Sequence, residues 1–345
     1  MRPDHHTILA AVNQAKGFRP AERLLRSMGY TISERSIRRT MAGLPDTDEP
    51  FSVDNGPELD IEELIRRRAK VFEKQNARRK HDKLIPVRVN MDGPIGLGFM
   101  GDPHVDSDGC NIELLMRHCE IFDGRNEGMF AACLGDMWNN WSGRLARLWA
   151  DQTTDGVEAR ALVKYFLERI YWMFVVYGNH DLWSGQSRIL DEMLAGNAGA
   201  VRDWRARVGL RFPNGRTCKI YASHRFPGRS MYLKNMGAVK KAVFDGQHDI
   251  YVSGDLHVAG YTLGAHPGAD RAYHAVQVGT YKEIDSFGDE INAEDHNLYT
   301  CPVALIDPYA KSPLNFIRWE FDPEQAVDRL AWMRSRWARN LSCED

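Results

Sequence analysis

The stretch Tyr171 to Asp181, YWMFVVYGNHD, joins an apolar run to a glycine and three polar residues. A short apolar run that ends at a glycine turn is typical of a buried strand, and residues 171–177 are predicted to form one. Open α/β sheets carry their binding sites at the carboxyl ends of such strands. The polar residues Asn179, His180 and Asp181 are therefore expected at the edge of a sheet, where they can meet other side chains.

Polar residues follow four further candidate strands. A glycine before the acid lets the chain turn sharply and leaves room for a ligand. Carboxylates and imidazoles are therefore expected to converge at one sheet edge. The segments are Gly101-Asp102-Pro103-His104 after 95–100, Gly135-Asp136 at the end of 130–135, Ser223-His224 after 217–222, and Gly254-Asp255-Leu256-His257 after 249–253.

From about residue 84 the chain alternates short β-rich runs with helical patterns. Strands crowd together toward the end, which predicts an α/β or α+β domain with a large mixed sheet system. A last amphipathic helix over 323–340 is expected to dock on this domain. The predicted strands are 95–100, 130–135, 171–177, 206–212, 217–222, 249–253, 273–279, 302–307 and 315–321, and the predicted helices are 109–122, 156–170, 186–195 and 235–244.

The composition is that of a folded protein. The chain has 345 residues, 43% of them hydrophobic, and a formal net charge of −2, which excludes a wholly disordered chain. Its longest apolar run, residues 170–177, is far shorter than the ~20 residues of a transmembrane helix, so no membrane span is expected. The first residues lead into no secretory signal, and no CxxC pair occurs, so reduced thiols and a cytoplasmic location are expected.

Charge is distributed in blocks, which usually mark separate modules. Residues 1–45 carry a formal charge of +5, residues 46–63 carry −8, residues 64–90 carry +8 and residues 91–345 carry −7. The predicted domains are a helical domain over 1–45, an acidic linker and basic helix over 46–90, the main domain over 91–322, and a C-terminal helix and tail over 323–345.

Residues 5–42 are predicted to form three short helices. The helix from Ala21 to Met28, a glycine turn and a helix capped by Ser33 resemble a helix-turn-helix. In the alternative, this is a small three-helix domain with a solvated basic helix. The basic helix within 58–83 either contacts phosphate backbones or covers the next domain. In the helix-turn-helix resemblance, the residues that face DNA are Arg35, Ser36, Arg38 and Arg39.

The residue types at the strand ends select a particular kind of metal site. Asp102 and His104 are two residues apart on an extended chain, so both can reach one ion. Oxygen and imidazole ligands without thiolate suit Mn²⁺, Fe, Zn²⁺ or Co²⁺ and exclude a structural zinc site of the cysteine type. Seven potential ligands fit two ions ~3.5–4 Å apart that share one carboxylate.

The order of these motifs, DxH, GD, GNHD, a single His and GxH, resembles the calcineurin-like metallophosphoesterase superfamily over residues 91–310. The segment from Gln277 to Asp285 is similar to metallophosphoesterases of bacteriophage genomes. The resemblance implies an α/β/β/α sandwich of two mixed sheets, here after a small helical domain. It also implies a phosphoester hydrolase with two divalent ions, in the cytoplasm of a bacterial or phage-infected host cell.

The resemblance also implies a role for each matching residue. A hydroxide that bridges the two ions would attack phosphorus in line. His180 would protonate the leaving oxygen without binding metal, and Asp181 would orient His180. The implied ligands are Asp102, His104 and His257 for the first ion, Asn179, His224 and Asp255 for the second, and Asp136 as the bridge.

Asp255 stands where the family usually has a histidine. If Asp255 ligates, its anionic oxygen shifts the preference toward Mn²⁺, Mg²⁺ or Fe and away from Zn²⁺. If it does not ligate, the second site is weak. We expect ligation, with Mn²⁺ as the favoured ion and Fe, Mg²⁺, Zn²⁺ or Co²⁺ as the other candidates.

Residues beside the motifs are candidates for substrate contact. Arg225 and Arg229 flank the predicted ligand after strand 217–222, and arginine forks suit phosphate oxygens. The segment after Asp136 supplies two more candidates, Asn139 and Asn140. The arginine of the protein-phosphatase motif GDxVDRG is missing from this segment, which counts against a protein phosphatase.

Aromatic residues in the same regions leave two readings open. Trp138 and Trp141 either stack on a base or sugar or pack in the core or at its rim. Tyr281 and Lys282 are expected at the same rim. Three functions compete: a phosphodiesterase or nuclease acting on DNA or RNA, a phosphatase or phosphodiesterase for small molecules, and a DNA-binding protein whose phosphoesterase domain is weakly active.

Overall fold

The computed structural model describes residues 1–43, 60–80, 83–185, 187–266, 271–284 and 298–341. Contacts divide the chain into two compact units, Met1–Lys74 and Gln75–Asp345. The boundary between the units lies within helix α4 (Ile61–Lys80). Of the predicted linker before α4, only Asp60 lies within the described residues.

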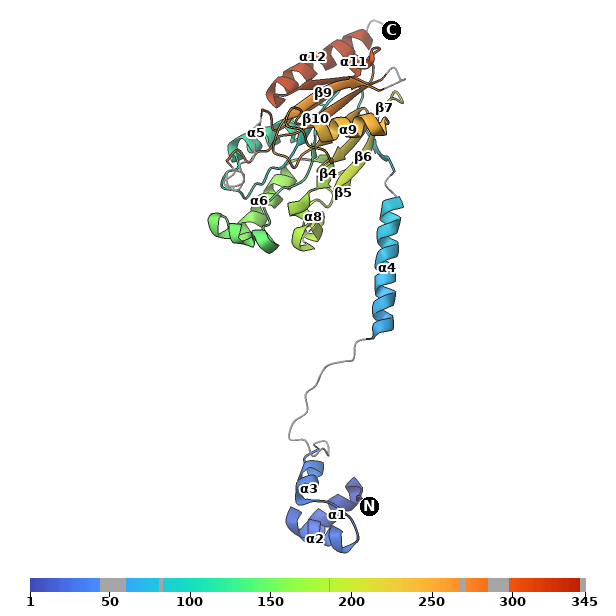
Figure 1. Ribbon diagram of the computed structural model, residues 1–345, viewed down its shortest axis with the longest axis vertical. Helices are drawn as coiled ribbons and strands as arrows, with labels where there is room; N and C mark the ends of the chain where they lie inside the picture. Colours follow the sequence, from blue (N-terminus) through green and yellow to red (C-terminus); the bar gives the residue numbers. More distant parts are fainter. Residues whose placement is uncertain (44–59, 81–82, 186, 267–270, 285–297, 342–345) are drawn as a thin grey trace. The chain divides into compact units, whose positions relative to one another are not determined.

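The N-terminal unit begins with three short helices, as the sequence predicts (Figure 1). They are α1 (His5–Ala15), α2 (Phe18–Ser27) and α3 (Glu34–Met41). The side chains of Asp4 and Ser33 accept hydrogen bonds from backbone amides in the first turns of α1 and α3, which satisfies amides that lack a helical partner. The helices share one small core, made of Ile8, Ala11, Ala21, Leu25, Ile32 and Ile37.

The larger unit contains two six-stranded sheets. The first sheet has the order β12 (Ile317–Glu320), β11 (Val303–Ile306), β2 (Ile95–Met100), β3 (Met129–Cys133), β4 (Trp172–Tyr177), β5 (Val201–Asp203). The second has the order β1 (Ile85–Arg88), β6 (Arg205–Arg211), β7 (Thr217–Ser223), β8 (Ile250–Ser253), β10 (Ala272–Gln277), β9 (Gly260–Ala265). Both sheets mix parallel and antiparallel pairs, for example β2 with β3 and β2 with β11 in the first.

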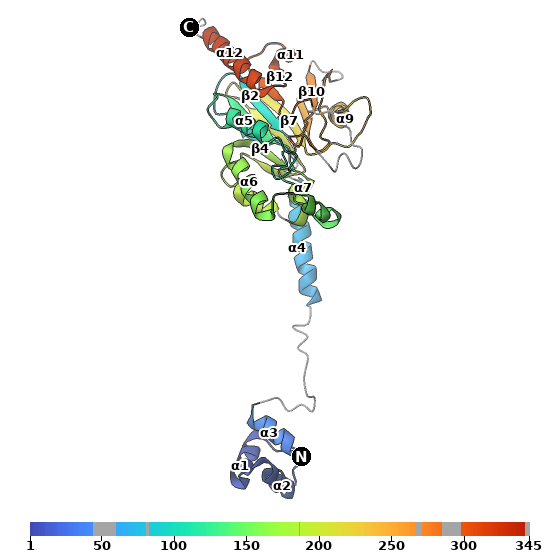
Figure 2. The ribbon, with the colours of Figure 1, turned by 90° about the vertical axis from the view of Figure 1, so that its left-hand side faces the viewer.

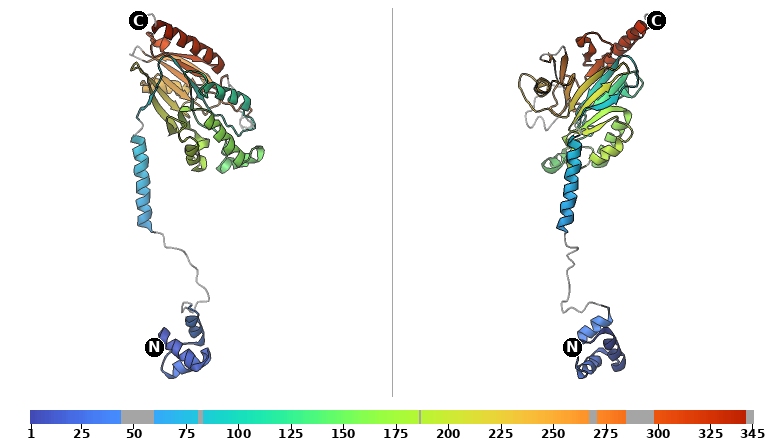
Figure 3. Two further views of the ribbon diagram at one scale, coloured as in Figure 1. Left: turned by 180° about the vertical axis from the view of Figure 1, so that it is seen from behind. Right: turned by 90° about the vertical axis from the view of Figure 1, so that its right-hand side faces the viewer.

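The two sheets form the inner layers of a four-layer sandwich (Figures 2 and 3). Apolar side chains of both sheets, such as Phe99, Phe174 and Ile220, meet between them in one core. Helices cover the outer faces: α5 (Ile112–Phe122), α6 (Gly156–Arg169), α8 (Ser187–Met193) and α12 (Pro323–Leu341) on the first sheet, and α9 (Met236–Asp245) on the second. The predicted α/β/β/α sandwich of two mixed sheets is confirmed.

Strand β2 shows how the sequence selects this layering. Leu97 and Phe99 face the core between the sheets, while Gly98 between them faces helix α5. A Cβ at Gly98 would overlap the ring of Phe122 in α5, so the helix packs closely only because this residue has no side chain. All of β2 is buried, as expected for a central strand that is covered on both faces.

Three strands differ from the predicted pattern. Strands β1, β5 and β9 are not predicted, and β1 lies in the segment assigned to the linker and basic helix. All three lie at sheet edges and are partly exposed, so they lack the continuous apolar run that marks the central strands. Four short helical segments are also new: η1 (Gly143–Asp151), α7 (Asn179–Leu182), η2 (Trp183–Gly185) and α11 (Pro313–Phe316).

Helix α12 docks on the larger unit, as its amphipathic pattern predicts. Leu330 and Met333 are buried in the core under the first sheet. Arg334 donates hydrogen bonds to the carbonyl groups of Asp92 and Pro94 at 3.1 and 2.9 Å, which ties the helix to the start of β2. Neither α12 nor any other described helix combines the length and the apolar character that crossing a membrane requires.

Candidate metal centre

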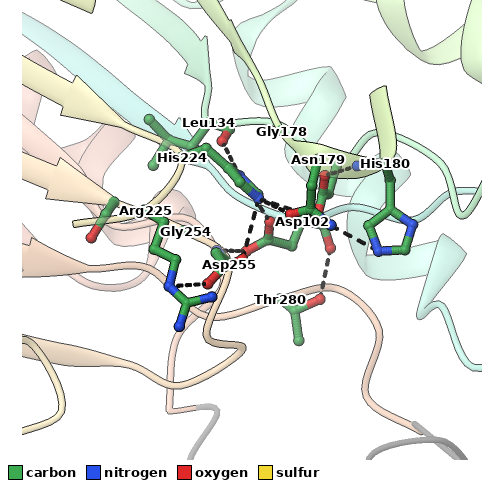
Figure 4. A network of polar contacts seen from close by, with 12 residues as sticks. Asp102, Leu134, Gly178, Asn179, His180, His224, Arg225, Gly254, Asp255 and Thr280 are labelled. Atoms are coloured by element: carbon green, nitrogen blue, oxygen red, sulfur yellow. Dashed lines mark hydrogen bonds and ion pairs between the residues drawn. The ribbon is translucent and has the colours of Figure 1, made fainter. Parts of the chain in front are cut away.

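The polar ends of five strands meet at one edge of the sandwich (Figure 4). We call these residues the strand-end cluster: Asp102 and His104 after β2, Asp136 after β3, Asn179 and His180 after β4, His224 after β7, and Asp255 and His257 after β8. Five of them, Asp102, His104, Asp136, Asp255 and His257, have positive φ angles between 42° and 72°. Such backbone strain in residues other than glycine is uncommon and concentrates at functional sites.

Glycines allow the strand ends to approach one another. Gly135 has φ +105°, and a Cβ there would lie 2.5 Å from the amide nitrogen of Gly178 and 2.8 Å from Nδ1 of His224. A Cβ on Gly178 would overlap Oδ1 of Asp136. Because Gly135 and Gly178 have no side chains, they leave the space that the Asp136 carboxylate occupies.

Asp136 lies between two sets of potential ligand atoms. Its Oδ1 accepts a hydrogen bond from the backbone amide of His180 at 2.9 Å, and its Oδ2 lies 3.2 Å from Nε2 of His224. One set contains His104, Asp136 and His180, and the other contains Asp102, Asp136 and His224. Within each set the ligand atoms lie within 4.8 Å of one another, and Asp136 belongs to both.

His224 gathers oxygen atoms around one ring nitrogen (Figure 4). Its Nδ1 lies 2.8 Å from the carbonyl oxygen of Leu134, a contact that places the proton on Nδ1 and leaves Nε2 to face the cluster. Nε2 is 3.0 Å from Oδ1 of Asn179 and 3.6 Å from Oδ1 of Asp255, in addition to its contact with Asp136. Three oxygens around one imidazole nitrogen form a donor set that suits a divalent cation.

Buried polar atoms of the cluster lack hydrogen-bond partners among the described residues. They are Oδ1 of Asp102 and both ring nitrogens of His104. Oδ2 of Asp102 accepts the amide of Asp255 at 2.6 Å, and the His104 ring lies 5.3 Å from that of His257 between centroids. An unsatisfied buried polar group costs roughly 1–3 kcal/mol, a cost that a bound cation removes. The residues therefore fit metal ions.

Burial and mutual repulsion shift the titration of the cluster. Burial would raise the pKa of Asp136, but the facing rings of His224 and His180 hold that pKa well below its usual range. Burial lowers the pKa of His224, but Asp136 and Asp102 outweigh this effect and raise the pKa well above its usual value. Burial, and then the charge of Asp136, raise the pKa of Asp181 to about 7. A cation bound among these carboxylates would therefore stabilise their charged forms.

The loop after β3 holds His180. Nδ1 of His180 contacts the carbonyl oxygen of Asn139, and the His180 ring centroid lies 4.1 Å from that of Trp183 and 5.1 Å from that of Trp141.

The structure corrects the expected role of Asp181, because this carboxylate faces the backbone and not the His180 ring. It accepts hydrogen bonds at 2.7–3.0 Å from three amides, those of Asp136, Met137 and Gly178.

The two candidate substrate arginines lie beside the cluster or at the surface. Arg225 follows His224 directly, and its Nε lies 3.2 Å from Oδ2 of Asp255, with 48% of the arginine side chain exposed. Arg229 is exposed, and its charge acts on the titration of Asp255. Both guanidinium groups are thus close enough to the cluster to influence an anion that binds there.

The two candidate asparagines are buried. Asn140 donates from Nδ2 to the carbonyl groups of His180 and Trp183 at 2.7 and 3.2 Å, so it holds the turn after β4. The expectation that Asn140 contacts substrate is therefore corrected. Asn139 donates from Nδ2 to Gln152 at 2.9 Å, while its Oδ1 has no partner among the described residues.

Helix α3 presents fewer residues to a partner than predicted. Ser36 is only 7% exposed and its Oγ lies 3.3 Å from that of Ser33, so the expectation that it faces DNA is wrong. Arg38 pairs with Glu34 at 2.8 Å and lies over the ring of Phe18. Of the other two predicted residues, Arg35 is exposed and Arg39 is partly exposed.

Two supporting residues carry no motif that would reveal them in the sequence. The Oγ of Thr280, after β10, donates to the carbonyl oxygen of Asp102 at 2.6 Å. The buried carboxylate of Asp106 accepts the amide of Asn139 at 2.7 Å and so holds the peptide that contacts His180. The one available signal was the position of Asp106, four residues after Asp102 in the same loop.

The aromatic residues beside the motifs separate into core and rim. Trp138 is 2% exposed and belongs to the core, whereas Trp141 is partly exposed. Tyr281 is fully buried and bonds Nδ1 of His118 at 2.7 Å, so its expected place at the rim is wrong. Lys282, the next residue, lines a cavity together with Trp141.

Comparison with known proteins found similarity only among solved structures, because no family model and no curated protein matches the sequence. Vps29 complexed with zinc from Entamoeba histolytica shares 13% identity over 66% of this chain and 97% of its own, with a TM-score of 0.33. A 5'-nucleotidase from Candida albicans shares 12% identity over 70% of this chain and 53% of its own, with a TM-score of 0.34. The calcineurin-like phosphoesterase YfkN from Bacillus subtilis shares 11% identity over 66% of this chain and 88% of its own, with a TM-score of 0.32. These likenesses are weak, and the metal centre is defined by the residues of this chain.

Proposed function

We propose that this chain is a metal-dependent phosphoester hydrolase with two divalent ions in the strand-end cluster. The observation that carries the proposal is the position of Asp136, whose carboxylate belongs to both sets of ligand atoms. Two-metal phosphoesterases need such a shared ligand to keep their ions close together. The order of the motifs and the four-layer fold support the same activity.

The cluster divides into two groups of ligands around Asp136. By the order of the motifs, Asp102, His104 and His257 would hold one ion, which would satisfy the unpartnered atoms of Asp102 and His104. Asp102 also lies within reach of the second ion, since its carboxylate belongs to the set with Asp136 and His224. His224, with Asn179 and Asp255 beside its Nε2, would hold the other. The ions would supply Lewis-acid polarisation of the phosphoryl group and an activated water.

His180 is the residue that we assign to proton transfer. The contact of Nδ1 with the carbonyl oxygen of Asn139 fixes the ring and keeps a proton on Nδ1. Nε2 then faces the cluster, 3.9 Å from Oδ2 of Asp136, where it can give a proton to the leaving oxygen. Asp181 acts indirectly, since it holds the amides of the turns that carry Asp136 and His180.

Asp255 and Arg225 set the charge of the second ligand group. Asp255 adds an anionic oxygen, which favours Mn²⁺ over softer ions. Arg225 lies 3.2 Å from that carboxylate and returns positive charge to the place where phosphate oxygens would bind. We propose a phosphodiester as substrate, because a single negative charge needs less compensation here than the two charges of a monoester.

We propose that the enzyme works in the cytoplasm of a bacterium or an infected host cell. The described cysteines, Cys110, Cys119, Cys133, Cys218 and Cys301, are free thiols, as expected in a reducing compartment. The resemblance of residues 277–285 to bacteriophage sequences supports the same assignment.

For the substrate, a small-molecule diester is the alternative to nucleic acid.

Removal of metal tests this activity directly. After treatment with EDTA and desalting, hydrolysis of bis(p-nitrophenyl) phosphate should fall to background, because the carboxylates and imidazoles of the cluster cannot activate water without cations. Mn²⁺ should restore the rate better than Zn²⁺, because of the anionic oxygen of Asp255. Equal rates for the chelated and the Mn²⁺-loaded protein would refute the proposed function.

The N-terminal unit supports a second activity, binding of DNA by helix α3. Residues 1–45 carry a charge of +5, and Arg35 is exposed on α3. The ion pairs of Arg26 with Glu22 and of Arg38 with Glu34 reduce the charge that this surface offers. We therefore propose a contact to phosphate through the exposed Arg35, with Arg38 holding the helix through its ion pair with Glu34.

A salt titration of DNA binding by the full-length chain tests the second activity. The logarithm of affinity should fall with the logarithm of salt concentration, with a slope near −0.9 for each phosphate contact. Arg35→Ala should reduce the slope by about one contact, whereas Arg125→Ala in the larger unit should not change it. If the full-length chain does not bind DNA at low salt, a small-molecule phosphoester is favoured as the substrate.

A further inference from the structure

A cavity of about 230 Å³ lies beside the strand-end cluster. Its walls include Trp141, Leu148, Lys282 and Asn139. Sites that enclose a whole small molecule typically measure ~300–1,000 Å³. The cavity therefore has room for one group of a substrate, and the rest of that substrate would extend outside it.

The cavity adjoins the proposed proton donor. The Trp141 and His180 rings form a T-shaped pair with centroids 5.1 Å apart, and the carbonyl oxygen of Asn139 contacts His180. On another wall, the amide of Lys282 donates to Oγ of Thr280, which itself donates to the carbonyl oxygen of Asp102. The loops that hold the strand-end cluster thus also form the cavity.

The aromatic wall is held in a fixed position. The indole nitrogen of Trp141 donates to Oε1 of Gln152 at 3.1 Å, and its carbonyl oxygen accepts from the indole of Trp149 at 2.8 Å. The ammonium of Lys282 lies 5.5 Å from the centroid of the Trp141 ring. On the face that Lys282 does not cover, a fixed indole offers a platform on which a planar ring stacks with little loss of conformational entropy.

The charges of the cavity walls do not suit a phosphate group in addition to the one that reacts at the strand-end cluster. Besides the ammonium of Lys282, the carboxylates of Asp108 and Asp151 line the cavity, so its formal charge is not positive. The lining residues carry both donors and acceptors, the ammonium of Lys282 and the carboxylates of Asp108 and Asp151 among them. A neutral planar ring that carries both donors and acceptors matches this lining, and nucleobases are such rings.

We propose that this cavity binds the nucleobase of a nucleoside that is the leaving group of the reaction. The inference rests on the proposed function for the reaction itself. Water adds to phosphorus and gives up a proton to solvent, the bond from phosphorus to the leaving oxygen breaks, and that oxygen takes its proton from Nε2 of His180. Because His180 lies between the cluster and the cavity, the group attached to the leaving oxygen enters the cavity.

Binding of adenosine to the full-length chain tests the proposal without catalysis. Calorimetry should give a dissociation constant for adenosine in the millimolar range or below. The dissociation constant for ribose should be at least roughly tenfold higher. Trp141→Leu should weaken adenosine binding roughly 5–150-fold, the range for one base stack, whereas Trp141→Phe should retain it. Trp332→Leu, at an indole that is 46% exposed on α12, is the matched control and should bind as the unchanged chain does.

Equal binding of adenosine and ribose, no binding of adenosine, or unchanged binding by Trp141→Leu would overturn the proposal. A kinetic comparison adds a second measurement, with adenosine 5'-(methyl phosphate) and ribose 5-(methyl phosphate) as diesters that differ only in the base. The ratio of their kcat/KM values should be roughly 5–150 and should approach one in Trp141→Leu. A ratio near one in the unchanged chain would overturn the base pocket and leave the proposed hydrolase intact. Failure to hydrolyse any phosphoester would instead overturn the proposed function, and adenosine binding would still decide the pocket.

Discussion

Asp136→Asn is expected to lose most of its bound metal and to lower diester turnover roughly 10³-fold or more. The amide keeps the size of the side chain but removes the charge that both ligand sets share. Loss of the ions forfeits several kcal/mol of transition-state stabilisation, at about 1.4 kcal/mol for each factor of ten. Elemental analysis of desalted protein gives the metal content, and kcat is measured on the same samples.

Asp123→Asn is the matched control for this substitution. Its carboxylate pairs with Arg125 away from the strand-end cluster, so metal content and turnover should stay at the level of the unchanged chain. Circular dichroism of both variants shows whether the fold is kept. Full metal content in a folded Asp136→Asn variant would show that Asp136 does not join the two ligand groups.

His180→Ala should keep its metal and lower kcat roughly 10²–10⁴-fold, the range for loss of a general acid. The ring of His180 lies near His104 and Asp136, so its geometry also permits ligation. Metal content separates the two roles, because a ligand would lose both metal and activity. An equal loss of metal and turnover would contradict the assignment of His180 to proton transfer.

The leaving group supplies a further check on His180. A strongly basic alkoxide needs a proton as it departs, whereas p-nitrophenolate departs readily without one. The defect of His180→Ala should therefore be much smaller for p-nitrophenyl esters than for alkyl diesters. His5→Ala, at an exposed histidine of the N-terminal unit, should behave as the unchanged chain with both substrates. A structural defect in His180→Ala would slow both substrates equally.

The central strands and their polar ends were predictable because each is a local pattern. The apolar run of β4 and the glycine after it mark a buried strand and its turn within a few residues. The same holds for β2 and its DxH motif. Spacing alone therefore predicted which polar residues would gather at one edge of the sheets.

The partners of individual side chains were not predictable in this way. The sequence could not show that Asp181 binds backbone amides and not the His180 ring, or that Ser36 is buried. The edge strands β1, β5 and β9 were also missed, since partial exposure removes the apolar pattern on which prediction depends.

The sequence by itself determined the layered fold and the chemical types at the strand ends. Only the tertiary structure decided that Asp136 joins the two ligand sets and that Trp141 and Lys282 line one cavity. The physical reason is the distance along the chain between the groups that meet. Thr280 and Asp102, which are 178 positions apart, share a hydrogen bond of 2.6 Å, and no periodicity of the sequence encodes such a contact. It forms only when strand pairing and core packing bring the two loops together.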